Sequence, residues 1–233
     1  MADRKALRLA ATSLFAGVAI SFVAGIFHPD REPANDHPAV FAEYAASSIW
    51  TLVHLGQFVG MTGLVSGLIG LFFALNVQEG RVGWIGKFGV VSSVVALALY
   101  GVLQAVDGVA LKQAVNAWAS APDGERAVRF ASAETIRWLE WGVRSYQSFT
   151  LGLSFLLFAT VIVLAASIPK AIGYLMGCAG MAYLVQSWII GSEGFSGHNV
   201  LPTLFGIILV LVTSIWIMWA AWRMPDAEAA DRG

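Results

Sequence analysis

Residues 50–75 read WTLVHLGQFVGMTGLVSGLIGLFFAL. This stretch is long enough to cross about 30 Å of hydrocarbon at about 1.5 Å per residue of helix. Its polar side chains, His54 and Gln57, lie near one end, and the rest is apolar or small. The stretch therefore predicts a membrane-spanning helix with a polar outer end.

Five further apolar runs have a similar length, and they occupy residues 8–27, 84–112, 138–167, 171–191 and 200–223. The composition agrees with a membrane protein, since 58% of the 233 residues are hydrophobic and 12% are charged. A soluble domain usually carries about 25% charged residues. The runs are too continuous for a transmembrane β-barrel, whose strands alternate over ~10 residues. We therefore expect an all-α polytopic fold with six transmembrane helices in one bundle.

Charge in the connections predicts the orientation. The short connections on one side carry Arg81, Lys87 and Lys170, and positive charge favours the cytoplasm. Both termini should then be cytoplasmic. The first run resembles a signal peptide but is longer than a usual apolar core of about 7–15 residues, so we interpret it as a retained span. Residues 1–223 form the predicted transmembrane domain, and residues 224–233 a short polar cytoplasmic tail.

Two outer connections have structure of their own. In residues 28–48 we expect an irregular start, because prolines disfavour helix in the residues before them, and then a short helix over 41–48. Helical spacing continues past the third span to a turn at Pro122–Gly124 and resumes into the fourth span. Ser132 either caps a new helix or lies within a continuous one. This pattern predicts a hairpin that projects beyond the outer face between helices three and four.

Polar side chains at membrane depth gather at the outer ends of the spans. Because such groups usually face a bundle interior or a water-filled cavity, they predict a polar pocket open to the extracytoplasmic side. The residues concerned are His28, His54, Gln57, Gln104, Asp107, Glu140, Arg144, Gln147, Gln186, Glu193 and His198.

Helical spacing places many of these side chains in stripes. Tyr100, Gln104 and Asp107 share one face of the third span under regular helical spacing. A buried ion pair between Asp107 and Arg144 would explain two charges within apolar runs. Arg137 and Glu140 are better explained by snorkelling to the headgroups or by pairing along their own helix. The glutamines either contact a ligand or join helices through hydrogen bonds.

Three kinds of chemistry fit these residues. In a ligand pocket, the binding groups would be Gln57, Gln104, Arg144, Gln147 and Gln186. In an enzyme, Asp107, Glu140 and His54 would transfer protons. A metal would be held by His28, His54 and His198, with Asp107 or Glu140 as a further ligand, and haem between His54 and His198 is a weaker alternative. The single cysteine, Cys178, excludes an intrachain disulfide and a multi-cysteine metal site.

Five glycines follow the second span: Gly56, Gly60, Gly63, Gly67 and Gly70. Two pairs among them have the G-x-x-x-G spacing that lets membrane helices approach closely. Packing inside the bundle is the preferred interpretation, and the face of a homo-oligomer is the alternative.

Three short motifs carry a resemblance to other proteins. They are Leu103–Gly108 at the end of the third span, Thr150–Ser154 in the fourth and Pro169–Tyr174 at the start of the fifth. With the hydropathy pattern, they resemble a group of uncharacterised bacterial six-span membrane proteins that is defined only as a domain of unknown function. The resemblance implies six spans and a bacterial cytoplasmic membrane, and it transfers no activity, cofactor or catalytic residue.

Taken together, the sequence predicts a protein that binds a small or amphipathic molecule, such as a lipid, an isoprenoid or a quinone-like compound, in its outer pocket. A membrane-embedded enzyme, metal-dependent in one form, is the first alternative. A structural or accessory subunit, with every polar group paired and no cavity, is the second. The chain has no basic patch or nucleic-acid-binding motif, so we expect membrane lipid as a partner and no nucleic acid.

Overall fold

The computed structural model describes residues 3–29 and 31–223, and this part of the chain is helical without strands. Six helices or helical segments in it are long and apolar enough to cross a membrane. The predicted tail, 224–233, lies outside the described residues. The six-span, all-α prediction is thus confirmed at the level of helix length and composition.

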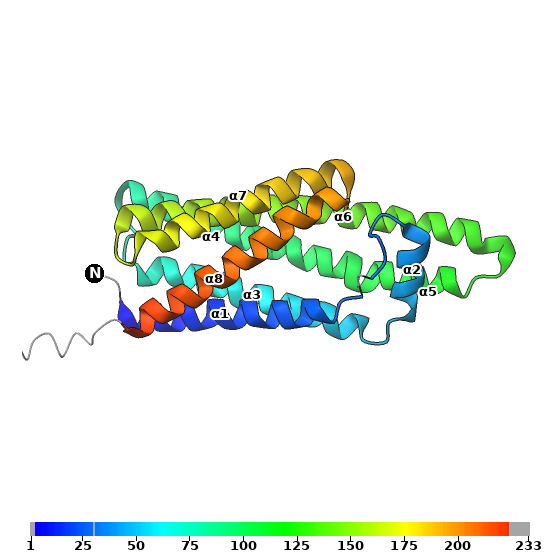
Figure 1. Cartoon of the computed structure of the whole chain (residues 1–233), viewed down its shortest axis with the longest axis horizontal. Helices are drawn as coiled ribbons and strands as arrows, with labels where there is room; N and C mark the ends of the chain where they lie inside the picture. Colours follow the sequence, from blue (N-terminus) through cyan, green and yellow to red (C-terminus); the bar gives the residue numbers. More distant parts are fainter. Residues whose placement is uncertain (1–2, 30, 224–233) are drawn as a thin grey trace, which may run out of the picture.

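The helices follow one another along the chain with short connections (Figure 1). Their bounds are α1 Arg4–Ile26, α2 His37–Ala46, α3 Trp50–Ala74, α4 Gly80–Leu103, the π-helix η1 Gln104–Leu111, α5 Lys112–Ala119, α6 Asp123–Ala165, α7 Lys170–Glu193, the 3-10 turn η2 Gly197–Asn199 and α8 Val200–Arg223. The segments α4, η1 and α5 form one continuous helical rod.

Local signals explain several of these ends. The Asp3 carboxylate accepts hydrogen bonds from the backbone N–H of Lys5 and Ala6 at 3.0 and 3.2 Å, which caps α1. Helices α6 and α7 each begin directly after a proline, Pro122 and Pro169. Helix α6 ends at Ala165, and the next residue, Ala166, adopts a left-handed conformation with φ of 51°.

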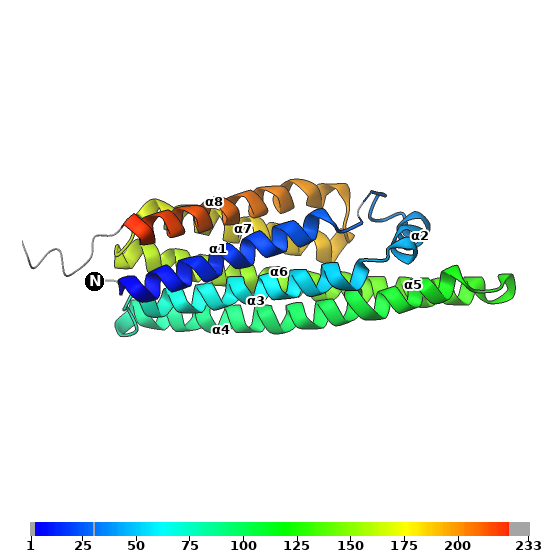
Figure 2. The same ribbon diagram turned by 90° about the horizontal axis from the view of Figure 1, so that it is seen from below.

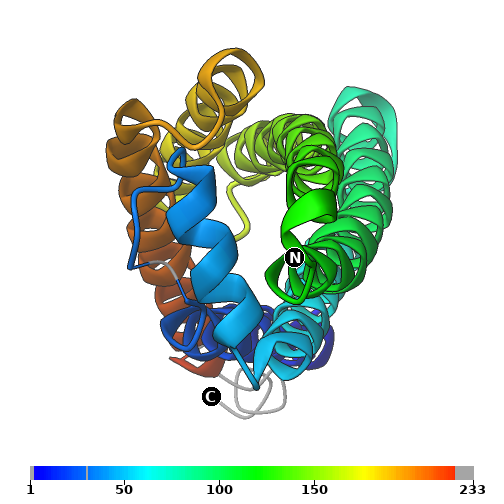
Figure 3. The ribbon, with the colours of Figure 1, turned by 90° about the vertical axis from the view of Figure 1, so that its right-hand side faces the viewer.

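The six long helices form a closed ring, because α1 packs on α3, α3 on α4, α4 on α6, α6 on α7, α7 on α8, and α8 again on α1. Figure 3 looks onto one end of this ring, with α2 lying across it. The start of α1 lies beside the end of α8, where Arg8 Nε donates to the carbonyl oxygen of Ala221 at 3.3 Å. The first and last spans therefore meet at the same end of the bundle.

At the opposite end, α5 and the first part of α6 extend past the other helices (Figures 1 and 2). The predicted hairpin is present, and Ser132 lies inside continuous helix, where its hydroxyl donates to the carbonyl oxygen of Val128 at 3.0 Å. Helix α2 packs on this hairpin through an apolar contact between Phe41 and residues of both hairpin helices, Trp118 and Phe130.

The short helix of the first connection differs from the prediction, because α2 begins at His37 rather than at Phe41. Asp36 and Pro38 account for the earlier start: the Asp36 carboxylate caps the backbone N–H of Ala39 at 3.4 Å, and proline is favourable in a first turn. Lys112 fixes the other end of α2, where its Nζ donates to three backbone oxygens between Tyr44 and Ser47 at 2.6–2.9 Å.

The glycines of α3 pack against α1. A side chain at Gly60 would overlap Ser21, and one at Gly67 would overlap the backbone of Leu14. Gly63 faces Gly17 in the same interface. The preferred interpretation, close packing inside the bundle, is therefore correct for these three glycines of α3.

Candidate functional site

A cavity of about 900 Å³ lies at the end of the bundle from which the hairpin projects. Its wall includes the residues after α1, the α4–η1 junction, the middle of α6 and the connection between α7 and α8. Many of the predicted polar residues line it, namely His28, Gln57, Gln104, Asp107, Glu140, Arg144 and Gln186. The structure thus brings together side chains from four helical segments, α3, η1, α6 and α7, and one loop.

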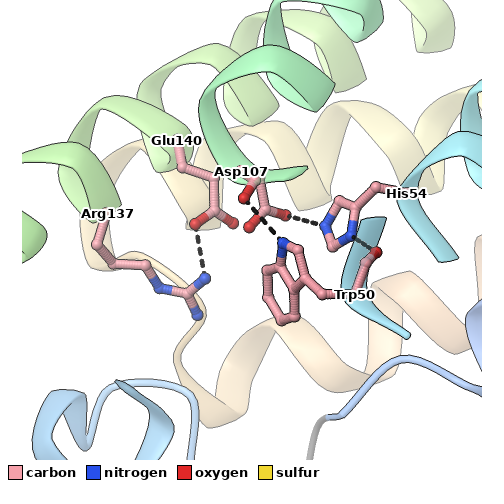
Figure 4. A network of polar contacts seen from close by, with 5 residues as sticks. All are labelled: Trp50, His54, Asp107, Arg137 and Glu140. Carbon is pink, nitrogen blue, oxygen red and sulfur yellow. Dashed lines mark hydrogen bonds and ion pairs between the residues drawn. The ribbon is translucent and has the colours of Figure 1, made fainter. Parts of the chain in front are cut away.

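Asp107 occupies the middle of the π-helix η1, and it is buried. Its Oδ2 lies 3.1 Å from Nε2 of His54 on α3 (Figure 4). The indole Nε1 of Trp50 donates to the Asp107 backbone oxygen at 3.2 Å, which fixes η1 against the start of α3. Short π-helical segments occur often at functional sites, since they redirect side chains within a helix.

The imidazole of His54 has a defined orientation. Its Nδ1 lies 2.8 Å from the Trp50 carbonyl oxygen, and because a carbonyl only accepts, Nδ1 must carry the proton. Gly108 lies directly against this side chain, and a Cβ there would come within 2.9 Å of the His54 Cβ. The absence of a side chain at Gly108 lets His54 reach Asp107.

His28 completes this group of side chains from the loop after α1. Its ring centroid lies 5.2 Å from that of His54 and 5.2 Å from that of Trp50. One ligand atom each of His28, His54 and Asp107 lies within 4.8 Å of the others. Two of the three histidines predicted as metal ligands are thus close together, with Asp107 beside them.

The third, His198, was predicted wrongly as a member of this group. Its ring is exposed on the surface, where Nδ1 bonds to Oε2 of Glu193 at 2.8 Å. His198 follows α7 on the short turn η2, and Glu193 ends α7, so the pair is local. The weaker haem hypothesis, which joined His54 to His198, fails for the same reason.

The expected ion pair between Asp107 and Arg144 is also wrong. Asp107 faces His54, and Arg144 Nη1 donates to Oε1 of Gln147 at 3.4 Å. Among residues 3–29 and 31–223, no carboxylate oxygen lies within 4.0 Å of the Arg144 guanidinium. Arg144 therefore lines the cavity as a cation without an acidic partner in the described part of the chain.

Arg137 and Glu140 form an ion pair along α6, which was one of the two interpretations of the sequence. Arg137 Nη1 donates to Oε2 of Glu140 at 2.6 Å, and the side chains are 3% and 4% exposed. The Arg137 guanidinium also lies over the rings of Tyr44 and Phe195, with centroids at 5.4 and 5.0 Å. This burial rules out the alternative in which the two side chains extend to the headgroups.

The glutamines divide between two roles. Gln186 Nε2 donates to Thr203 Oγ1 at 2.8 Å, and its Oε1 accepts from Ser148 at 3.2 Å, so it joins α6, α7 and α8 while lining the cavity. Gln147 is fully buried and does not line the cavity. Gln104 and Gln57 reach the wall, and the buried Oε1 of Gln104 has no hydrogen-bond partner among the described residues.

Sequence reasoning missed part of the wall. Glu32 and Asn35 come from the loop before α2, Phe195 from the connection after α7, and Thr203 from the first turn of α8. These residues lie in segments whose course depends on tertiary contacts, such as the hydrogen bond from Asn35 Nδ2 to the Glu193 backbone oxygen at 3.2 Å. The only local signal for these wall residues was the pair of prolines, Pro29 and Pro33, which indicates an irregular course for the loop before α2.

Comparison with protein-family models, with characterised proteins and with solved structures gives no match for this chain. A functional assignment therefore depends on the geometry of the site.

Proposed function

We propose that the chain is a multi-pass protein of a bacterial cytoplasmic membrane that binds a small or amphipathic ligand in the cavity. The ligand is a lipid, an isoprenoid or a quinone-like molecule, and the cavity faces the extracytoplasmic side. The observation that carries the proposal is the cavity itself, in which polar and charged side chains from several elements converge beside apolar ones such as Leu103, Val200 and Leu204, at one end of an apolar bundle.

The basic residues at the far end of the bundle support this orientation. The connections that follow α3 and α6 lie at the same end as the start of α1 (Figure 1). Arg81 and Lys170 lie in the first turns of the helices after these connections, and short loops rich in basic residues favour the cytoplasm. The cavity, at the other end, then opens outside.

The volume suits one ligand of moderate size. Small-molecule sites span roughly 300–1,000 Å³, and the cavity reaches about 900 Å³. Arg144 supplies the strongest polar contact for a headgroup, because its guanidinium has five donors and no carboxylate beside it in the described chain. A headgroup with a phosphate, carboxylate or carbonyl oxygen would satisfy it.

The start of α8 offers an apolar surface beside the cavity. Val200 and Leu204 form part of the wall, and the neighbouring Leu201 and Phe205 are 77% and 52% exposed without lining the cavity. A chain leaving the cavity over these residues would pass directly into the lipid layer. This arrangement favours an amphipathic ligand over a fully water-soluble one.

A purely structural role would require that the polar groups satisfy one another. The buried atoms Gln104 Oε1 and Asp107 Oδ1 have no hydrogen-bond partner within residues 3–29 and 31–223, which supports a ligand or solvent in contact with them. The second candidate function is a membrane-embedded enzyme, favoured by the contact between the Asp107 carboxylate on the cavity wall and the buried His54 imidazole behind it.

Native mass spectrometry of the detergent-purified protein, followed by lipid extraction, tests the ligand. We expect one tightly held amphiphile in the wild type and a clearly lower occupancy in Arg144→Gln, since loss of a hydrogen bond to a charged group, about 1.5–3 kcal/mol, weakens binding at least about tenfold. Arg129→Gln is the matched control, because Arg129 lies on the same helix in an exposed pair with Glu125.

Arg129→Gln should retain the wild-type occupancy. A wild-type protein that carries no amphiphile, or an Arg144→Gln variant with unchanged occupancy, would contradict the proposal.

A further inference from the structure

Three side chains with metal-binding atoms converge on the cavity end from three separate elements. His28 follows α1, His54 is on the second turn of α3, and Asp107 is in η1. Their ligand atoms lie within 4.8 Å of one another. Residues this far apart in sequence meet only because the ring of helices brings them together.

The distance between the facing atoms of His54 and Asp107 is the distance expected between two ligand atoms of one metal ion. Zinc binds histidine nitrogen and carboxylate oxygen at about 2.0–2.2 Å, so two such ligands stand about 3.0 Å apart at a right angle and about 3.4 Å apart at a tetrahedral angle. His54 Nε2 and Asp107 Oδ2 are 3.1 Å apart. A cation between them therefore needs little movement of either side chain.

The backbone around His54 prepares Nε2 for a metal. Because Nδ1 donates its proton to the Trp50 carbonyl oxygen at 2.8 Å, a neutral imidazole presents the lone pair of Nε2 toward Asp107. Metal-binding histidines almost always have such a second hydrogen bond, which fixes the ring and its tautomer.

Asp107 supplies an independent observation. The residue is 9% exposed, and its buried Oδ1 has no hydrogen-bond partner in the described part of the chain. A simple contact between Asp107 and His54 uses one carboxylate oxygen and leaves the other unsatisfied, which is costly in a buried site. A cation beside the carboxylate compensates both oxygens.

We propose that His28, His54 and Asp107 bind one divalent transition-metal ion. Two imidazoles and one carboxylate suit Zn²⁺ or Fe²⁺, whereas Mg²⁺ and Ca²⁺ prefer oxygen ligands alone. Three protein ligands leave at least one coordination position open, and His28 and Asp107 both line the cavity. A water molecule or a ligand oxygen in the cavity can occupy that position.

This site does not depend on the amphiphile, so each proposal can fail without the other. The test uses the full-length protein in detergent, stripped with a chelator and titrated with Co²⁺, whose visible absorption reports its coordination. Zn²⁺ is then measured by its displacement of Co²⁺ and by elemental analysis. We expect one equivalent bound to the wild type.

The variants His28→Gln and Asp107→Ala should each bind Co²⁺ more than about 100-fold more weakly than the wild type. Loss of a residue that only supports a ligand would weaken binding by about 10–100-fold. His198→Gln is the matched control, because His198 also contacts a carboxylate at 2.8 Å, but on the surface. It should bind as the wild type does.

Circular dichroism and thermal unfolding test whether each variant folds. If Asp107→Ala does not fold, His28→Gln still tests the site, because His28 lies outside the helices. The proposal is overturned when the folded wild type binds no Co²⁺ or Zn²⁺. It is equally overturned when His28→Gln binds with unchanged affinity or when His198→Gln abolishes binding.

Discussion

The interface between α1 and α3 and the cavity at the hairpin end are built in opposite ways. In the interface, glycines bring the two backbones into contact, as at Gly60 and Gly67. Around the cavity, large polar side chains such as Arg137, Glu140 and Arg144 stand between the helices. The first region has no room for another atom, and the second leaves about 900 Å³ open.

This difference shows how one bundle can combine stability with a site. Membrane helices gain little from the hydrophobic effect and rely on close contact, which the glycine interface supplies. The polar groups at the cavity carry desolvation costs that only mutual pairing or a bound group offsets. Substitutions in the two regions can separate these contributions, beginning with the one that should cost the most stability.

The buried ion pair should be the most sensitive point at the cavity. Glu140→Gln leaves the Arg137 charge buried without its partner, and we expect a loss of about 3–5 kcal/mol in the free energy of unfolding. Replacing both residues together, as Arg137→Met with Glu140→Leu, should cost much less than Glu140→Gln alone. Denaturant or thermal unfolding in detergent measures both.

Glu125→Gln on the same helix is the control, because its pair with Arg129 is exposed and should contribute less than about 1 kcal/mol. Equal losses for Glu125→Gln and Glu140→Gln would show that burial of the pair is unimportant.

In the glycine interface, Gly67→Ala should cost about 2–3 kcal/mol, because its Cβ would overlap the Leu14 backbone and force α1 away from α3. Gly25→Ala makes the same chemical change in α1, where a Cβ meets nothing within 4 Å. That control should be neutral or stabilising by about 0.5–1 kcal/mol, the ordinary gain of alanine over glycine in a helix. Thermal unfolding that ranks Gly25→Ala below Gly67→Ala would refute the role of this interface.

Gly108→Ala tests both regions at once, because Gly108 is a closely packed glycine that lies against a residue of the site, His54. The added Cβ would press on His54, so we expect a loss of about 1–2 kcal/mol in stability and about tenfold weaker Co²⁺ binding. Gly101→Ala is the control, because its Cβ would make an ordinary 3.5 Å contact with Phe58. Unfolding and Co²⁺ titration of both variants measure the two effects, and unchanged Co²⁺ affinity in Gly108→Ala would count against a positioned His54.

The sequence predicted the membrane helices better than the contacts between them. Run length and apolar composition located six helices, because a span needs about 20 apolar residues in any arrangement. The polar residues Gln57, Gln104, Asp107 and Gln186 were correctly placed on a common cavity wall, since polar groups at membrane depth avoid lipid.

The pairings were harder to predict. Regular spacing cannot describe η1, because a π-helix replaces the usual i→i+4 hydrogen bonds with i→i+5 bonds and changes the direction of the following side chains. Asp107 therefore meets His54 rather than Arg144. His198 and His28 looked equivalent in the sequence, yet the turn after α7 gives His198 a local partner in Glu193.

By itself, the sequence determined that this chain forms long apolar helices, that a hairpin extends between the third and fourth, and that the polar groups gather at one end. These properties depend on the composition and spacing of neighbouring residues. Only the tertiary structure decided which polar groups meet, because the relative rotation of six helices and the π-helical segment set distances between residues far apart in the chain. It brought His28, His54 and Asp107 together and left Arg144 facing the cavity.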